Sequence, residues 1–301
     1  MAQSGVSVLI NGFGVLFVIL NSFGLGLRLP VGKLLAQVAT HWKIATWALV
    51  INFVIIPAIF VGYLLTVASS IPGEIKVGFC VAALSAGMPF APLLARLAKA
   101  NVSIATTLLV VLTTATIIAL PIGLPLAIDA VDAHLTTSPW AILWPLLVFL
   151  LVPVILGCAF RVWWPELAKP LAKWVVRLAI VCLLFNLNFT LVAYWDQFVQ
   201  TWGTESYIGA LAGPFIGLGS GYLLVSGLRF TDVGVRHATE ITTAVRNIAP
   251  MLLMMIFPFG ADPLVTVSIT ILNTVGIVIV VCFALVWRRA ASRSDRHAPV
   301  S

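Results

Sequence analysis

Charged residues are scarce in this sequence. Asp, Glu, Lys and Arg together make up 9% of the 301 residues, whereas apolar residues make up 61%. A water-soluble domain of this length carries about 25% charged residues. The composition therefore excludes an ordinary soluble domain and predicts an integral membrane protein that has lipid as its solvent.

Several chemical motifs are also absent. The sequence has no P-loop, no HExxH, no GxSxG and no pair of buried carboxylates, so neither ATP hydrolysis nor another enzymatic activity is expected. The net charge of +7 does not indicate nucleic-acid binding, because the basic residues lie between apolar runs. We expect no disulfide and no bound metal, since four cysteines lie singly in apolar runs without CxxC or Cys/His spacing: Cys80, Cys158, Cys182 and Cys282.

Long apolar runs fill most of the chain. A helix needs about 20 mostly apolar residues to cross the hydrocarbon, and it must be helical because lipid leaves no other partner for backbone amides. This predicts an all-α membrane protein of about nine spans, in which residues 1–289 form a single transmembrane transporter domain. The predicted spans are 6–27, 42–67, 75–99, 102–128, 138–160, 171–195, 205–228, 233–259 and 262–287.

The basic residues alternate from one side of these spans to the other. Fifteen of the 17 Lys and Arg residues fall on one side, whereas the opposite side carries six acidic residues and Lys76. Because cytoplasmic loops are enriched in Lys and Arg, the chain is predicted to lie in the inner or plasma membrane with its N-terminus outside. Residues 290–301 then form a basic cytoplasmic tail.

Two of the spans carry similar segments. The segment 90–94 (Phe-Ala-Pro-Leu-Leu) in the third span matches 248–252 (Ile-Ala-Pro-Met-Leu) in the eighth. The two spans are five apart and so cross in opposite directions, which is typical of an inverted-topology repeat. Proline inside a helix removes a hydrogen bond, so Pro89 with Pro92, and Pro250, are predicted to break these spans near the bilayer centre, where the freed backbone groups can hold a solute.

One charged residue lies deep in the eighth span. Arg246 is four positions before Pro250, and a cation at that depth is expected to belong to a functional site. Asn247 follows it, and Asn52 lies in the second span. The remaining polar candidates precede Arg246 in the same span, although Glu240 could instead be interfacial: Glu240, Thr242 and Thr243.

The chain resembles the bile acid:sodium symporter family, within the wider superfamily of bile-acid, arsenite and auxin carriers. The likeness covers nearly the whole chain and is carried by four fragments in the family's order and spacing: Phe23-Gly24-Leu25-Gly26-Leu27, 52–57, 97–102 and Gly221-Tyr222-Leu223-Leu224. The resemblance implies that spans 3 and 8 are two crossing broken helices. It also implies a core of spans 2–4 and 7–9 and a panel of spans 1, 5 and 6.

The family's sodium-site pattern is not kept. Where the family's second crossing helix typically reads Glu-x-Gly-x-Gln-Asn, this chain has residues 242–247, so that Thr242 replaces the glutamate and Arg246 the glutamine. The Ser-Asn pair of the first crossing helix corresponds to Ala91 and Pro92, and the glutamine of span 2 to Asn52. Sodium requires several oxygen donors and a balancing negative charge, so its binding here is doubtful.

These observations predict a secondary transporter for a small organic anion. Arg246 would attract the anion or replace the ion, Asn247 and Asn52 would donate or accept hydrogen bonds, and the backbone near Pro92 and Pro250 would complete the site. Two alternatives stay open, namely a sodium-coupled symporter that uses Glu240 and backbone carbonyls, and a receptor that binds a ligand without moving it. No partner beyond the anion and the lipid is expected, and neither the solute nor the oligomeric state follows from the sequence.

Overall fold

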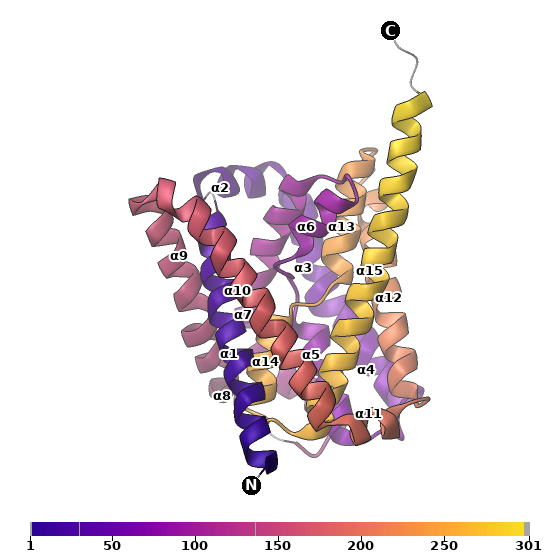
Figure 1. Cartoon of the computed structure of the whole chain (residues 1–301). Coiled ribbons are helices and arrows are strands. Elements are labelled where there is room, and N and C mark those ends of the chain that lie inside the picture. The colour runs from indigo at the N-terminus through magenta and orange to yellow at the C-terminus, as the bar shows by residue number, and fades with distance from the viewer. Residues whose placement is uncertain (1, 30, 136, 298–301) are drawn as a thin grey trace.

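The computed structural model describes residues 2–29, 31–135 and 137–297, and within them every regular element is a helix (Figure 1). The elements in chain order are α1 (Ala2–Arg28), α2 (Val31–Thr40), α3 (Trp42–Val50), the π-helical turn η1 (Ile51–Ile55), α4 (Ile56–Thr66), α5 (Gly73–Leu84), α6 (Ala91–Leu97), α7 (Val102–Ala130), α8 (Pro139–Pro145), the π-helical turn η2 (Leu146–Leu151), α9 (Val152–Trp163), α10 (Pro165–Ala193), α11 (Trp195–Thr201), α12 (Glu205–Gly227), α13 (Val233–Ala244), α14 (Ile248–Ile256) and α15 (Pro263–His297).

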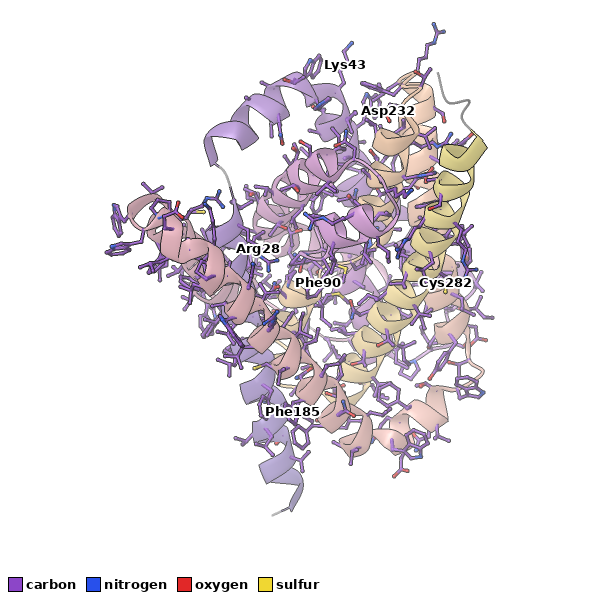
Figure 2. All side chains as sticks on the ribbon, turned by 45° about the horizontal axis from the view of Figure 1, so that its top comes forward. Arg28, Lys43, Phe90, Phe185, Asp232 and Cys282 are labelled. Atoms are coloured by element: carbon purple, nitrogen blue, oxygen red, sulfur yellow. The ribbon has the colours of Figure 1, made fainter. Side chains whose placement is uncertain are left out.

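Seven continuous helical segments in the described part of the chain are long and apolar enough to cross a membrane. They correspond to seven of the predicted spans, and many of their large apolar side chains face outward, as lipid contact requires (Figure 2). The third and eighth predicted spans are instead each built from two shorter helices, α5 with α6 and α13 with α14. The two pairs run in opposite directions, and each is interrupted at about mid-height of the bundle (Figure 1).

Pro89 lies inside the first interruption, whereas Pro92 and Pro250 lie just after the two interruptions. The first spans residues 85–90 and the second residues 245–247, so Pro92 and Pro250 lie in the first turn of the second half-helix. The first four amides of a helix have no acceptor within it, so proline costs little there. In the first interruption the backbone turns at Gly87, whose φ of +82° suits glycine. Pro92 and Pro250 thus mark where each second half-helix begins.

Proline does distort two other helices. Each π-helical turn ends two positions before a proline: η1 before Pro57 and η2 before Pro153. Proline has no N–H to donate four residues back, and the neighbouring amides reach one residue further, as from Ile56 N–H to the Ile51 carbonyl. The first of these turns holds Asn52 at its start.

Some helices were not predicted. Helices α2 and α11 are short connectors outside the expected spans, and the Thr107 hydroxyl ties α2 to α7 by donating to Gln37 Oε1 at 2.9 Å. The predicted tail is helical from residue 290 to His297, as the continuation of α15. Residues 298–301 of that tail, and the side chains of residues 293–297, lie outside the described part.

The helices pack in two groups. Helix α1 lies against α9 and α10, whereas α12 lies against α13, and α15 against α5 (Figure 1). Helices α12 and α13 approach closely because Gly217 and Gly221 of α12 face the α13 backbone at Ala244 and Glu240. Small residues one turn apart allow such close contact between membrane helices. Helix α12 therefore positions the half-helix that leads to Arg246.

We expect Gly221→Ala to destabilise this contact. An added Cβ would lie 2.6 Å from Glu240 Cα, so the two helices must move apart, at a cost of about 1–3 kcal/mol. Thermal unfolding of the detergent-solubilised protein should show a melting temperature several degrees lower. Gly219→Ala on the same helix is the matched control because its Cβ would meet open space, and equal melting of the two variants would contradict the packing argument.

Candidate functional site

Arg246 lies in the interruption between α13 and α14 and donates three hydrogen bonds. Its guanidinium reaches Asn52 Oδ1 at 3.2 Å, the Ala83 carbonyl at 3.3 Å and the Thr243 carbonyl at 2.9 Å. The Asn52 side chain is itself held by a donation from Nδ2 to the Ala48 carbonyl at 2.9 Å. All three acceptors are uncharged, and Arg246 forms no ion pair within the described residues.

Two of these acceptors are helix ends. The Ala83 carbonyl belongs to the last turn of α5 and the Thr243 carbonyl to the last turn of α13. Such carbonyls lack an intrahelical donor and carry the negative end of the helix dipole. Helices α5 and α13 approach each other from opposite halves of the bundle (Figure 1). Their negative ends meet at Arg246, which donates to a carbonyl of each. The guanidinium neutralises both ends at once.

A backbone hydrogen bond joins the two interruptions directly. Asn247 N–H donates to the Ser85 carbonyl at 2.9 Å, while Asn247 Oδ1 accepts from Ala249 N–H at 3.1 Å and so caps α14. Asn247 Nδ2 is buried and has no partner among the described residues. Asn247 therefore fixes the start of α14 against the end of α5.

Helix α7 holds the first interruption in place. Thr116 Oγ1 donates to the Ala86 carbonyl and accepts from Ala86 N–H, both at 3.1 Å, and Thr113 Oγ1 donates to the Gly87 carbonyl at 2.9 Å. The sequence reading did not single out either threonine. The sequence did contain one indication of their role: the two threonines are three positions apart and so lie on the same face of the helix that follows the broken segment.

A small cavity of about 20 Å³ adjoins Arg246, which is enough for about one water molecule. Asn273 of α15 also lines it, and Asn273 Oδ1 is buried without a partner in the described structure. The Thr243 hydroxyl is likewise buried and unpaired. Asn273 is thus a second residue at this site that the sequence reading missed, because nothing along the chain links it to Arg246.

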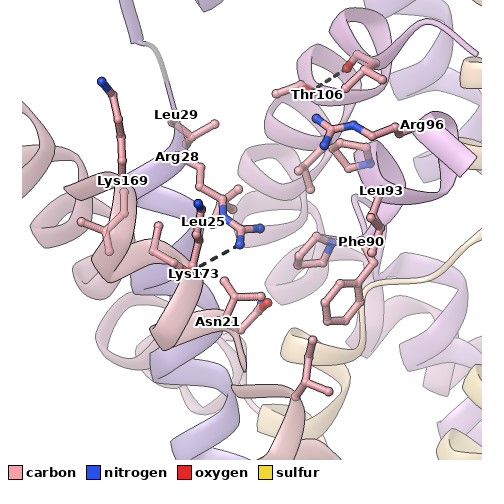
Figure 3. Close-up of a pocket in the computed structure, with 18 of the residues that line it drawn as sticks. Asn21, Leu25, Arg28, Leu29, Phe90, Leu93, Arg96, Thr106, Lys169 and Lys173 are labelled. Atoms are coloured by element: carbon pink, nitrogen blue, oxygen red, sulfur yellow. Dashed lines mark hydrogen bonds between the residues drawn. The ribbon is translucent and has the colours of Figure 1, made fainter. Parts of the chain in front are cut away.

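A much larger cavity of about 620 Å³ opens on the other side of the first interruption (Figure 3). Pro92 and Phe90 line it beside residues of α1, α7, α9 and α10. None of its lining residues is acidic, and five are basic: Arg28, Arg96, Arg161, Lys169 and Lys173. Its volume lies within the range of small-molecule sites, and its charge favours an anion.

The residues predicted to form one site thus lie at several separate positions in the structure. Arg246, Asn247, Asn52 and the Thr243 carbonyl come together, whereas Pro92 lines the large cavity. Ala91 and Pro250 are buried in the first turns of α6 and α14, and the Thr242 hydroxyl bonds back to the Ala238 carbonyl at 2.6 Å. The buried Glu240 carboxylate pairs with Arg236 instead, with 3.8 Å between Oε1 and Nε.

Seven long apolar helices with two interrupted helix pairs define a multi-pass membrane protein of the transporter class, in which discontinuous helices meet at a polar site. The profile of the Sodium Bile acid symporter family matches residues 15–201, which is more than half of the chain. The chain therefore belongs to this family, whose members are transporters, and the resemblance seen in the sequence is confirmed. The matched region ends before α12 and does not include Arg246. A comparison with curated proteins finds no match.

We expect Thr116→Val to destabilise the first interruption. The change keeps the side-chain shape but leaves both backbone groups of Ala86 without their partner, which costs about 1–3 kcal/mol. Thermal unfolding in detergent measures this loss. Thr106→Val is the matched control, since the Thr106 hydroxyl bonds only to the Val102 carbonyl of its own helix. An equal loss of stability in both variants would show that the hydrogen bonds between Thr116 and Ala86 do not stabilise the interruption.

Proposed function

We propose that this protein is a secondary transporter that carries a small organic anion by alternating access and needs no sodium ion. The observation that carries the proposal is the position of Arg246, which donates to carbonyls at the ends of both α5 and α13 and to Asn52. A fixed cation there supplies the positive charge that a bound ion would otherwise bring.

The geometry favours the Arg246 guanidinium over a sodium ion as the cation at this position. Sodium requires several oxygen ligands and a nearby negative charge. Here the Asn52, Ala83 and Thr243 oxygens accept hydrogen bonds from Arg246, and residue 242 is a threonine whose hydroxyl bonds to its own helix. These oxygens already have a cationic partner, so a sodium ion would have to compete with it.

The large cavity supports an anionic solute. It lies between α1, α9 and α10 on one side and α6 and α7 on the other, beside the interruption that α7 holds. Its basic residues attract anions, and its apolar residues can cover the body of an organic molecule. Movement of one group of helices relative to the other would open such a cavity to alternate sides of the membrane.

The proposed architecture counts α5 with α6, and α13 with α14, as one crossing each. This gives nine crossings related by an inverted repeat, with spans 2–4 and 7–9 as the core and spans 1, 5 and 6 as the panel. The opposed directions of the two interrupted pairs support this arrangement (Figure 1). The charge distribution supports an extracellular N-terminus and a cytoplasmic C-terminus in the inner or plasma membrane.

We expect uptake of an organic anion into proteoliposomes to be the same in sodium and in choline buffer. A panel of radiolabelled linear mono- and dicarboxylates serves as the probe. Arg246→Ala should abolish uptake because both helix ends lose their donor, and Arg246→Lys should rescue it only in part because an ammonium lacks the planar fork. Arg229→Gln, an exposed cation outside the site, is the matched control and should transport normally.

The double variant Thr242→Glu with Arg246→Gln tests the replacement directly. It restores the two residue types that the family typically has at these positions, so uptake should become sodium-dependent, by roughly threefold or more over choline. Loss of wild-type uptake in choline, or normal uptake by Arg246→Ala, would refute Arg246 as the substitute for the ion.

A further inference from the structure

We propose that the large cavity selects an organic dianion, with one anionic group at each end of an apolar body. The proposal rests on the proposed function and specifies its substrate class. It is based on the way in which the basic residues of the cavity are divided between its two walls, with apolar residues between them.

The first wall belongs to α1, α9 and α10. Arg28 and Lys173 project into the cavity from this side (Figure 3). The Arg28 guanidinium donates to the Ala172 carbonyl of α10 at 3.5 Å, and the Arg161 guanidinium of α9 donates to the Leu27 carbonyl of α1 at 3.0 Å. These two bonds tie the three helices together and hold the cations at the wall. Arg28 keeps further N–H groups free for a ligand.

The opposite wall belongs to α6. Arg96 extends from the last turn of this half-helix toward the cavity (Figure 3). Neither the Arg96 guanidinium nor the Lys173 ammonium has a hydrogen-bond or ion-pair partner within the described part of the chain. Arg28 and Arg96 act on each other electrostatically across the space, and both are positive. The cavity therefore has positive charges that repel each other on opposite walls (Figure 3).

Apolar side chains lie between the two sets of charges. Leu25 of α1, Phe90 of the interruption and Leu93 of α6 line the cavity together with Val176 of α10 (Figure 3). An anion with a single charged group leaves one wall uncompensated, whereas a molecule with two charged ends satisfies both walls and lays its body on the apolar residues. Charge-assisted hydrogen bonds from Arg to carboxylate are among the strongest available to a protein.

Dianion binding also affects closure of the cavity. The repulsion between Arg28 and Arg96 opposes any approach of the two walls, and a ligand that bridges them converts this repulsion into attraction. The solute itself then removes the barrier to the movement that carries it. Glu166 does not provide this compensation, because it pairs with the exposed end of Lys169, at 3.3 Å.

The test compares suberate with octanoate, which share an eight-carbon chain and differ in one carboxylate. The full-length protein is placed in phosphatidylcholine nanodiscs, and the affinity for each compound is measured by titration calorimetry. Suberate should bind roughly tenfold more tightly or better, which corresponds to one additional charge-assisted contact. Arg96→Gln should weaken suberate binding by roughly tenfold more than octanoate binding, and so remove this preference. Arg177→Gln is the matched control, since Arg177 is an exposed cation one turn from Lys173 that does not line the cavity.

Each outcome separates the two proposals. Equal affinity for both compounds, or equal weakening of both by Arg96→Gln, overturns the dianion while an organic-anion transporter stands. Failure of both compounds to bind overturns the dianion together with the proposed anion site. Nanodiscs that contain phosphatidylglycerol form the last arm. If this lipid displaces suberate, the cavity holds a lipid headgroup and the proposal is wrong.

Discussion

The meeting of two helix C-termini inside a membrane is the constraint on which the rest of this structure depends. Helices α5 and α13 end at the same place, and their last carbonyls cannot turn to water as they would at a surface. Arg246 satisfies Ala83 and Thr243 together and brings the positive charge that two dipole ends favour. A charge at this depth costs about 3 kcal/mol or more when isolated, so the cation and the helix ends stabilise each other.

The surrounding helices keep the interruptions in a fixed form. Thr113 and Thr116 of α7 hold the backbone at Ala86 and Gly87, and the Asn247 amide bonds to Ser85. Helix α12 packs closely against α13 at Gly217 and Gly221, and this contact fixes the position of α13. The irregular backbone is thus bonded on all sides by protein, which is the condition for non-helical segments at membrane depth. Such a rigid unit can move as a whole.

The two sets of basic residues have different roles in this view. Arg246 is committed to backbone carbonyls and Asn52, so its charge is part of the fold. The cations of the large cavity face one another with few partners, so their charge is available to a solute. In the proposed mechanism the fixed cation takes the place of a coupling ion, so the direction of transport would depend on the gradient of the solute or of a second solute.

The sequence by itself determined the membrane character, the family and the presence of a cation deep in an apolar segment, because apolar run length, motif order and residue type are local properties of the chain. Only the tertiary structure decided which residues surround Arg246. Asn52, which accepts a hydrogen bond from Arg246, and Asn273, which lines the same small cavity, both lie far from Arg246 along the chain, so their proximity depends on how the helices pack. The same applies to the exact ends of the interruptions, where Gly87 and the threonines of α7 hold the backbone, and to Glu240, which pairs with Arg236 one turn away. The large cavity draws its charges from four helices and so exists only when they are assembled.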